Sequence, residues 1–305
     1  MALSKKVIKQ KIATARNIRK TTKTMEMISA VKMRRMIART NGVRQYAHFA
    51  LELIQKISQV EELDSPLIAE RKRGRTLLVI IASQKGLCGG YNVNLGRKLL
   101  DLLKTGKLKA KDTDVIAVGR NAEKMALRAK FNLVASFPGL SEIAAPAEVL
   151  PIFNAFMDKF LETDHYQRVV SLHTGFVKPM EYEPLFLRVL PISKKMLEGI
   201  TATNQDKEAD SMNIDLYTFE PSRQAILSQA LPQLLQAVFF EDVIESLAAE
   251  HGSRMVAMKS ATDNAEAMQA ELTLWFNKAR QQAITQEISE ISGGAEALAG
   301  ATLSV

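Results

Sequence analysis

The apolar residues near the C-terminus follow a heptad pattern over a long uninterrupted segment. Residues 253–292 contain no glycine or proline, and as one helix these 40 residues would extend roughly 60 Å. Steps of three and four alternate along a narrow stripe, as in a coiled coil: Met258, Ala261, Ala265, Met268, Leu272, Trp275 and Ala279. A second stripe, offset around the helix, follows: Ile284, Ile288, Ile291, Ala295 and Leu298. The pattern predicts one long helix that meets two different neighbours in succession.

The N-terminal segment has a matching pattern. Residues 1–41 also lack glycine and proline, and their stripe consists of Ile8, Ile12, Ala15, Ile18, Thr22 and Met25. Apolar spacing resumes after Gly42, so we expect one helix over residues 4–58. Such a narrow stripe needs a second helix to cover it, and the C-terminal stripe has a similar width. If the middle of the chain folds compactly with its ends adjacent, the two helices must pair antiparallel.

The middle of the chain has the pattern of an α/β domain. The run TLLVIIAS at residues 76–83 is typical of a strand buried on both faces. Further strands are predicted at 114–119, 133–137, 168–176 and 185–190, and helices at 94–103, 120–130 and 146–162. This alternation predicts a mostly parallel sheet with covering helices. Pro232 predicts a helix break or a first-turn position. The chain is thus α/β, with three parts: 1–60, 76–191 and 215–305.

Charge distinguishes the N-terminal helix from the rest of the chain. Residues 1–44 hold 13 Lys or Arg and one acid, whereas the whole chain has a formal net charge of +8. A basic helix implies an acidic partner, which could be nucleic acid, anionic lipid or an acidic protein surface. No aromatic residue precedes Tyr46, so base stacking is not favoured. A partner-facing charge stripe is the preferred interpretation, and a basic coiled-coil protein that binds nucleic acid is the alternative.

Candidate small-molecule chemistry centres on the glycine-rich loop at residues 86–90. A loop after a buried strand could cradle a phosphate, and a small dinucleotide-binding enzyme is a third interpretation. The loop matches neither GxGxxG nor a P-loop, so a structural turn is favoured. Cys88, the single cysteine, has no histidine near it in sequence, and the four histidines have no metal-ligand spacing. We expect no catalytic residue, cofactor or metal. No apolar run reaches the ~20 residues of a membrane span.

Three blocks of sequence resemble the gamma subunit of the F-type ATP synthase. They are KTTKTMEMISAVKMRR at 20–35, ASQKGLCGGYN at 82–92, and residues 247–298 with RMVAMKSATDNA and NKARQQAITQEISEISGGAEAL. YTFEPS at 217–222 adds a shorter match. The chain departs from the family pattern at residues 83–85 and 238–244, and it lacks the long cysteine-bearing insertion of the chloroplast form. The resemblance therefore implies a bacterial-type chain.

The resemblance also implies an architecture and a role. It implies a long antiparallel coiled coil of N- and C-terminal helices beside a Rossmann-like α/β domain. The expected function is that of the central-stalk rotor subunit, which transmits rotation of the membrane ring to three catalytic sites for proton-driven ATP synthesis. The expected partners are the ring of alpha and beta subunits, the epsilon subunit and the c-ring, with no nucleic acid. The expected location is the cytoplasmic side of a bacterial plasma membrane, as a peripheral protein.

Residue by residue, the resemblance implies a set of partner contacts. Met25 and the cations Lys32, Arg34 and Arg35 would face acidic loops of the catalytic subunits. Cys88 belongs to the turn expected near the lower rim of the ring. The upper stalk would contribute hydrogen bonds from Arg254, Arg280, Gln281 and Thr285. An apolar sleeve of the ring would surround the tip of the C-terminal helix, including Ile288 and Ile291.

Overall fold

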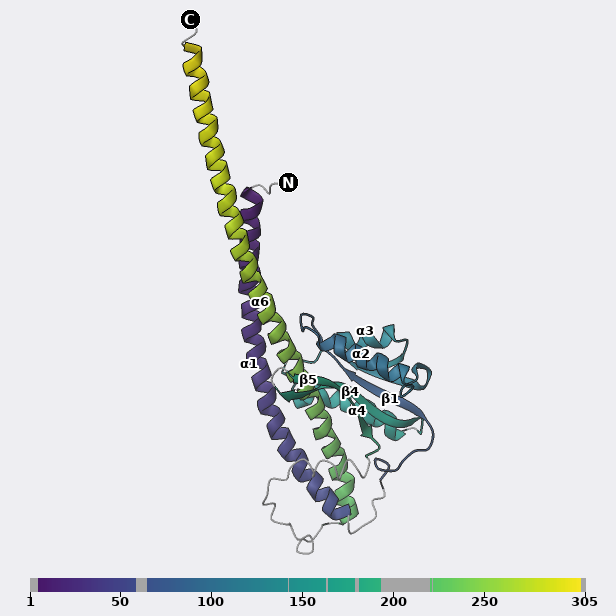
Figure 1. The fold of residues 1–305 in the computed structure, drawn as a ribbon. Helices are drawn as coiled ribbons and strands as arrows, with labels where there is room; N and C mark the ends of the chain where they lie inside the picture. Colours follow the sequence, from purple (N-terminus) through teal and green to yellow (C-terminus); the bar gives the residue numbers. More distant parts are fainter. Residues whose placement is uncertain are drawn as a thin grey trace. The chain divides into compact units, whose positions relative to one another are not determined.

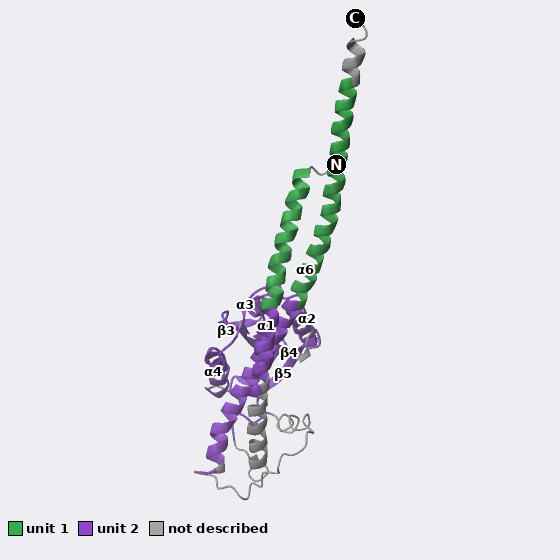
Figure 2. Cartoon of the chain, turned by 90° about the vertical axis from the view of Figure 1, so that its left-hand side faces the viewer, with its two compact units in different colours: residues 1–28, 256–305 green, residues 29–255 purple. Residues whose placement is uncertain are grey.

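The computed structural model describes residues 5–58, 65–141, 143–162, 164–178, 181–192, 220 and 222–302. Side-chain environments are described for these residues except 41, 44–58, 177–178, 223 and 296–302. The chain divides into two compact units, shown in green and purple in Figure 2. Unit 1 comprises residues 1–28 and 256–305, and unit 2 comprises residues 29–255. Two helices contribute to both units: α1 (Lys5–Ser58) and α6 (Arg223–Thr302).

Unit 1 is an antiparallel helix pair. Figure 2 shows its two helical segments side by side. Thr262 Oγ1 donates to Thr22 Oγ1 at 2.8 Å, and Arg19 Nη1 lies 3.9 Å from Glu266 Oε1. Residue numbers thus fall along α1 as they rise along α6. These two contacts confirm the predicted pairing of the two chain ends, because residues 240 positions apart in sequence touch directly. The opposite numbering along the two helices shows that the pairing is antiparallel.

The packing seam of this pair differs from the predicted one. In unit 1, the buried and half-buried residues of α6 are Ala257, Met258, Ala261, Thr262, Ala265, Gln269, Leu272, Phe276, Ala279 and Ala283. Ile18, Met268 and Trp275 were predicted in the seam, but they are 47%, 55% and 56% exposed. Met258, Ala261, Ala265, Leu272 and Ala279 belong to both versions, and all of them except Ala261 repeat every seven residues. The residues on either side of this stripe around the helix also fit a heptad spacing. The direction from which the partner helix packs therefore decides which side becomes buried.

Unit 2 contains a five-stranded sheet. Its strands are β1 (Arg75–Ile81), β2 (Thr113–Val118), β3 (Asn132–Phe137), β4 (Tyr166–Lys178) and β5 (Glu181–Leu190). Their spatial order is β3-β2-β1-β4-β5, with β5 antiparallel to β4 and the other pairs parallel. The predicted mostly parallel sheet is confirmed. The antiparallel strand occupies one edge of the sheet, and β1 lies at its centre.

Helices cover both faces of the sheet (Figure 1). On one face, α2 (Tyr91–Lys104) and α3 (Arg120–Arg128) pack on Leu78 and Ile80. On the other, α4 (Pro146–Glu162) and the first part of α6 pack on Leu77 and Val79. Successive residues of β1 therefore belong to opposite cores, which explains why its apolar run is continuous. The short 3-10 helix η1 (Ala110–Asp112) leads into β2.

Pro232 lies inside α6 and does not break it, so the predicted break or first-turn position is wrong. A proline inside a helix removes one backbone hydrogen bond and crowds the preceding turn. The neighbours Leu231, Leu234 and Leu235 are each no more than 3% exposed and belong to the core that contains α4. Burial of these apolar side chains offsets the local cost and keeps the helix continuous. Within the described residues, no helix is both long and apolar enough to cross a membrane.

Candidate interaction surface

The turn after β1 is held by a network of polar contacts. Asn92 Nδ2 donates to Ser83 Oγ at 2.7 Å, across the base of the turn. Leu87 and Gly89 have positive φ angles of 60° and 55°, a conformation that leucine rarely adopts. Leu87 is 63% exposed, whereas Cys88 is only 3% exposed. The turn therefore presents Leu87 to its surroundings and keeps Cys88 inside.

The same turn is hydrogen-bonded to α6 within unit 2. Ser253 Oγ donates to the carbonyl of Cys88 at 2.6 Å. Arg254 Nη2 donates to the carbonyl of Gly86 at 3.3 Å and to Glu250 Oε1 at 2.5 Å. Arg254 is 7% exposed, so its guanidinium is largely occupied inside unit 2. These contacts join the first βα turn to a helix that lies more than 150 residues further along the chain.

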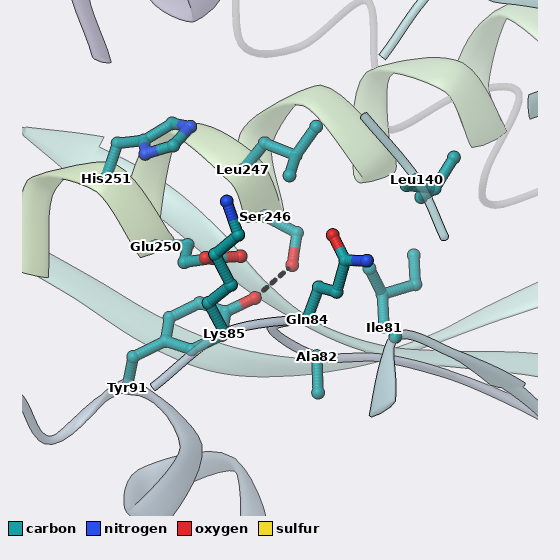
Figure 3. Close-up of a pocket in the computed structure, with 11 residues that line it drawn as sticks. Ile81, Ala82, Gln84, Lys85, Tyr91, Leu140, Ser246, Leu247, Glu250 and His251 are labelled. Atoms are coloured by element: carbon teal, nitrogen blue, oxygen red, sulfur yellow. Dashed lines mark hydrogen bonds between the residues drawn. The ribbon is translucent and has the colours of Figure 1, made fainter. Parts of the chain in front are cut away.

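A small cavity lies between this turn and α6 (Figure 3). Its lining includes Lys85, Tyr91, Ser246, Glu250 and His251, and its volume of about 20 Å³ is room for roughly one water molecule. The hydroxyls of Tyr91 and Ser246 are 2.7 Å apart, as the dashed line in Figure 3 shows. In a Rossmann domain the dinucleotide binds outside the carboxyl ends of the strands. Here α6 fills that space, so this cavity cannot accept a dinucleotide.

Glu250, which lines the cavity, is a carboxylate on which three cations act electrostatically. Burial raises the pKa of Glu250, while Arg254, Lys85 and Lys32 pull it in the opposite direction. Burial, followed by repulsion from Lys85 and Arg254, lowers the pKa of Lys32. Burial and the same cations lower the pKa of His251 to about 3, so this ring is neutral at physiological pH. The cluster thus has more positive than negative groups.

The candidate residues at the C-terminal end of α6 lie in unit 1. Arg280, Gln281 and Thr285 are exposed, and Thr285 Oγ1 donates to the carbonyl of Gln281 at 3.0 Å. Ile288 and Ile291 are 62% and 73% exposed. The pairing of Thr22 with Thr262 and Arg19 with Glu266 extrapolates to a position near 280 opposite Lys5, where α1 begins. Beyond that position, the described part of α1 has no residue left to cover α6.

The candidate residues of α1 differ in exposure. Met25, in unit 1, is half-buried. Lys32, in unit 2, is also half-buried and adjoins the Glu250 cluster, whereas Arg34 and Arg35 are exposed. The structure therefore brings Lys32, Cys88 and Arg254 together around one turn, but the remaining candidates are distributed along the two helices.

Comparison with known proteins identifies the family. A family model described as ATP synthase matches residues 4–298. The ATP synthase gamma chain of Stenotrophomonas maltophilia is 33% identical over 95% of this chain and 98% of its own length. That of Symbiobacterium thermophilum is 32% identical over 98% of this chain and all of its own length. The chain belongs to the ATP synthase gamma chain family.

Solved structures of ATP synthases share the fold. A chain of the Euglena gracilis mitochondrial ATP synthase rotor superposes with a TM-score of 0.60 at 16% identity, covering 92% of this chain and 98% of its own. A second chain, from an OSCP/F1/c-ring structure of the same enzyme, has a TM-score of 0.62 at 15% identity, covering 99% and 96%. None of these relatives is described as a nucleic-acid-binding protein, so nothing here favours that alternative.

Family membership makes the chain a subunit of the complex that makes ATP. The individual partner contacts remain predictions. Two of them, Cys88 and Arg254, are buried in the chain by itself, where they secure the turn and α6. Sequence reasoning missed Leu87 and Glu250. Nothing in the loop sequence indicates which side chain points outward, but Glu250 precedes Arg254 by four residues, a spacing that signals a helical ion pair.

Proposed function

We propose that this chain is the non-catalytic rotor subunit of a bacterial ATP synthase. It carries rotation from the ion-driven membrane ring to the three catalytic sites of the alpha–beta ring. Its expected partners are the alpha, beta and epsilon subunits and the c-ring, and its expected location is the cytoplasmic face of the plasma membrane. The structural relatives support this proposal, because they come from a rotor and from an assembly with F1 and a c-ring.

The observation that carries the proposal is the exposed apolar stripe of α6 beyond the start of α1. Ile284, Ile288 and Ile291 are 46%, 62% and 73% exposed on successive turns of one helix. A contiguous apolar stripe of this kind is costly in water and is typical of a protein–protein contact. A surrounding sleeve of other subunits would cover it, as the central position of a rotor requires.

The paired helices suit the transmission of torque. Two helices that pack along a seam resist twisting better than one, and the seam here alternates small, polar and apolar side chains. An asymmetric helix pair that turns inside a ring contacts each catalytic subunit differently in turn. Such differential contact is what shifts a subunit between conformations of different nucleotide affinity.

A non-catalytic role agrees with the interior of unit 2. The crevice where a Rossmann domain would bind a nucleotide is filled by α6, and its remaining cavity has room for roughly one water molecule. Within the described residues, no group of three or more His, Cys, Asp or Glu side chains could hold a metal ion. Unit 2 then serves as a rigid attachment for the c-ring and the epsilon subunit, and we place these contacts at the end of unit 2 where α6 begins.

Co-expression with ATP synthase alpha and beta subunits tests the proposal. We expect a soluble complex with one copy of this chain per ring of three alpha and three beta subunits, and ATP hydrolysis that depends on its presence. Native mass spectrometry measures the stoichiometry. Failure of the folded chain to join the ring, or hydrolysis that is the same with and without it, would overturn the proposed function.

A further inference from the structure

The amino-terminal edge of the parallel sheet is strongly basic. Four strands begin there, since Arg75 of β1 pairs with Tyr166 of β4, Thr76 with Thr113 of β2, and Asp114 with Asn132 of β3. The segments that lead into these strands, 70–75, 104–112, 128–130 and 164–168, form what we call the basic edge. They contain eleven Lys or Arg and three acids, a net charge of +8 with His165 neutral, as large as that of the whole chain.

Three arginines of the basic edge have structural roles. Arg75 Nη2 lies 2.6 Å from Asp114 Oδ1, and this pairing raises the pKa of the guanidinium. Arg168 Nε donates to Thr76 Oγ1 at 3.1 Å, and Arg71 Nη1 donates to the carbonyl of Tyr166 at 2.9 Å. These contacts tie neighbouring strand ends together, so these three cations need no further explanation.

Among the described residues, none of the remaining cations of the basic edge ties strand ends together in this way. All eight are exposed: Lys72, Arg73, Lys104, Lys107, Lys109, Lys111, Arg128 and Lys130. The described part of the chain gives none of them an ion pair. Of the three acids, Glu70 pairs with Arg188 and Asp164 with Arg71, which leaves Asp112. Like charges concentrated on one edge repel one another, so the edge lowers stability unless an anionic partner is present.

The basic edge lies at a defined end of unit 2. Leu67, which precedes β1, belongs to the same core as Leu227 near the start of α6. The carbonyl of Leu67 accepts a hydrogen bond from the Ile192 N–H at 2.8 Å. The opposite edge of the sheet lies beside Ser253, as the contact with Cys88 shows. The four parallel strands, β1 to β4, therefore run in the same direction as α6, and the basic edge is at the end where α6 begins. In the proposed function, on which this inference rests, that end is nearest the membrane.

We propose that the basic edge is an electrostatic docking surface for the anionic phospholipid headgroups of the membrane. Six of the eight exposed cations are lysines, which carry compact charges on flexible stems and do not demand a particular bidentate geometry. Each Lys or Arg near an anionic bilayer contributes about 1 kcal/mol of attraction. Such an attraction is diffuse, so it holds the subunit toward the bilayer without favouring one rotational angle.

A lipid surface fits this edge better than a nucleic acid does. Proteins that bind single strands combine a basic groove with exposed aromatic rings on which bases stack. Aromatic residues beside the basic edge, namely Tyr166, Phe131 and Phe160, are 6%, 5% and 0% exposed and belong to the cores. The exposed cations instead occupy three separate segments along one edge, an arrangement that suits a broad charged surface.

Vesicle binding by the assembled complex with alpha and beta subunits tests the proposal. The edge variant carries Lys104→Gln, Lys107→Gln, Lys109→Gln and Lys111→Gln. The control variant carries Arg97→Gln, Lys98→Gln, Arg120→Gln and Lys124→Gln, which remove the same charge from α2 and α3. Sedimentation measures binding to phosphatidylcholine vesicles with and without phosphatidylglycerol. We expect the wild-type and control complexes to bind the anionic vesicles, with an affinity that falls as the salt concentration increases. We expect the edge variant to bind these vesicles at least tenfold more weakly than the wild type.

Equal binding to neutral and anionic vesicles would overturn the inference, as would equal losses in the edge and control variants. Stronger binding of single-stranded RNA than of anionic vesicles, lost in the edge variant, would also overturn it in favour of a nucleic acid. Assembly is scored separately. If no complex forms, the proposed function fails, and the same comparison on the isolated full chain still tests the lipid surface.

Discussion

Thr262 donates its side-chain hydroxyl to that of Thr22 at 2.8 Å, although 240 residues separate the two. This bond lies in the seam of unit 1, where both side chains are at least half-buried. It replaces the apolar pair that a regular coiled coil would place at this level. The seam of unit 1 therefore includes a directional polar contact that fixes the relative register of the two helices.

Loss of this hydroxyl should weaken the helix pair. Thr262→Val keeps the side-chain volume but removes the donor, so we expect the free energy of unfolding to fall by about 1 kcal/mol. Urea titration of the full chain, followed by circular dichroism, measures the change. Thr273→Val is the matched control, because its hydroxyl bonds only to the Gln269 carbonyl of the same helix. Additive effects of Thr22→Val and Thr262→Val would contradict a direct interaction.

A methyl group at Gly119 should destabilise unit 2. The residue has a φ of 93°, and an added Cβ would lie 2.1 Å from the Ala82 carbonyl oxygen. Both the strained backbone and the collision oppose the substitution, so we expect Gly119→Ala to cost at least about 2 kcal/mol. Gly96→Ala is the control, since α2 leaves open space there and helix propensity favours alanine by about 1 kcal/mol. Similar thermal stabilities of the two variants would show that this reasoning is wrong.

The Tyr91 hydroxyl should stabilise the contact between α2 and α6. Tyr91 is 2% exposed, and its bond to Ser246 Oγ is buried. We expect Tyr91→Phe to lower the free energy of unfolding by about 1–3 kcal/mol, because a buried polar group loses its partner. Ser246→Ala should have a similar effect, and the double variant should lose less than the sum. Chemical denaturation of all four proteins measures this coupling, and strict additivity would argue against it.

The buried Asp242 should make stability depend on pH. Its Oδ2 accepts from Ser171 Oγ at 3.1 Å, and burial raises its pKa to about 7. The facing His173 has its pKa lowered to about 4 by burial, despite the acids Glu241 and Glu245. Between pH 4 and 7 the folded chain therefore keeps a proton on Asp242 that the unfolded chain has released. The protonated Asp242 carboxyl therefore stabilises the folded chain relative to the unfolded chain at low pH, and this stabilisation is lost as pH rises through 7.

Asp242→Asn separates this effect from that of His173. Asparagine retains the acceptor for Ser171 but cannot ionise. We therefore expect the free energy of unfolding of the variant to rise relative to that of the wild type as pH increases from 5 to 8. The difference should be a few kcal/mol at most, on the order of 1.4 kcal/mol per unit of pKa shift. The lowered pKa of His173 acts in the opposite sense: stability falls as pH drops from 6.5 through 4, in both proteins. Urea titrations across this range measure the difference, and a constant difference at all pH values would exclude ionisation of Asp242 as the cause.

The polar residues beyond the helix pair should matter for coupling and not for folding. Arg280 and Gln281 are both exposed, so we expect Arg280→Ala with Gln281→Ala to leave the unfolding transition within about 0.5 kcal/mol of wild type. In the assembled complex the same variant should lower ion-coupled ATP turnover. Lys278→Ala with Glu287→Ala, also exposed on α6, is the control. Wild-type turnover of the first variant would remove both residues from the partner contacts.

Much of the architecture could be predicted because local pattern decides it. The helices over residues 5–58 and 146–162 and the buried run of β1 appear in the structure close to their predicted bounds. Heptad spacing at both ends of the chain indicates that each needs a helical partner. The alternation of strands and helices predicts the mostly parallel sheet. Period, glycine and proline act over a few residues, so the amino-acid sequence by itself determines these features.

Tertiary packing decided what these patterns leave open. Either flank of a heptad stripe satisfies the same spacing, and only the partner helix selected Phe276 over Trp275. Pro232 remains helical because its neighbours share a core with α4. The basic edge could not be recognised in the sequence, since its cations come from four segments that only the sheet brings together. Side-chain burial and the gathering of charge depend on contacts between distant segments, so they exist only once the chain has folded.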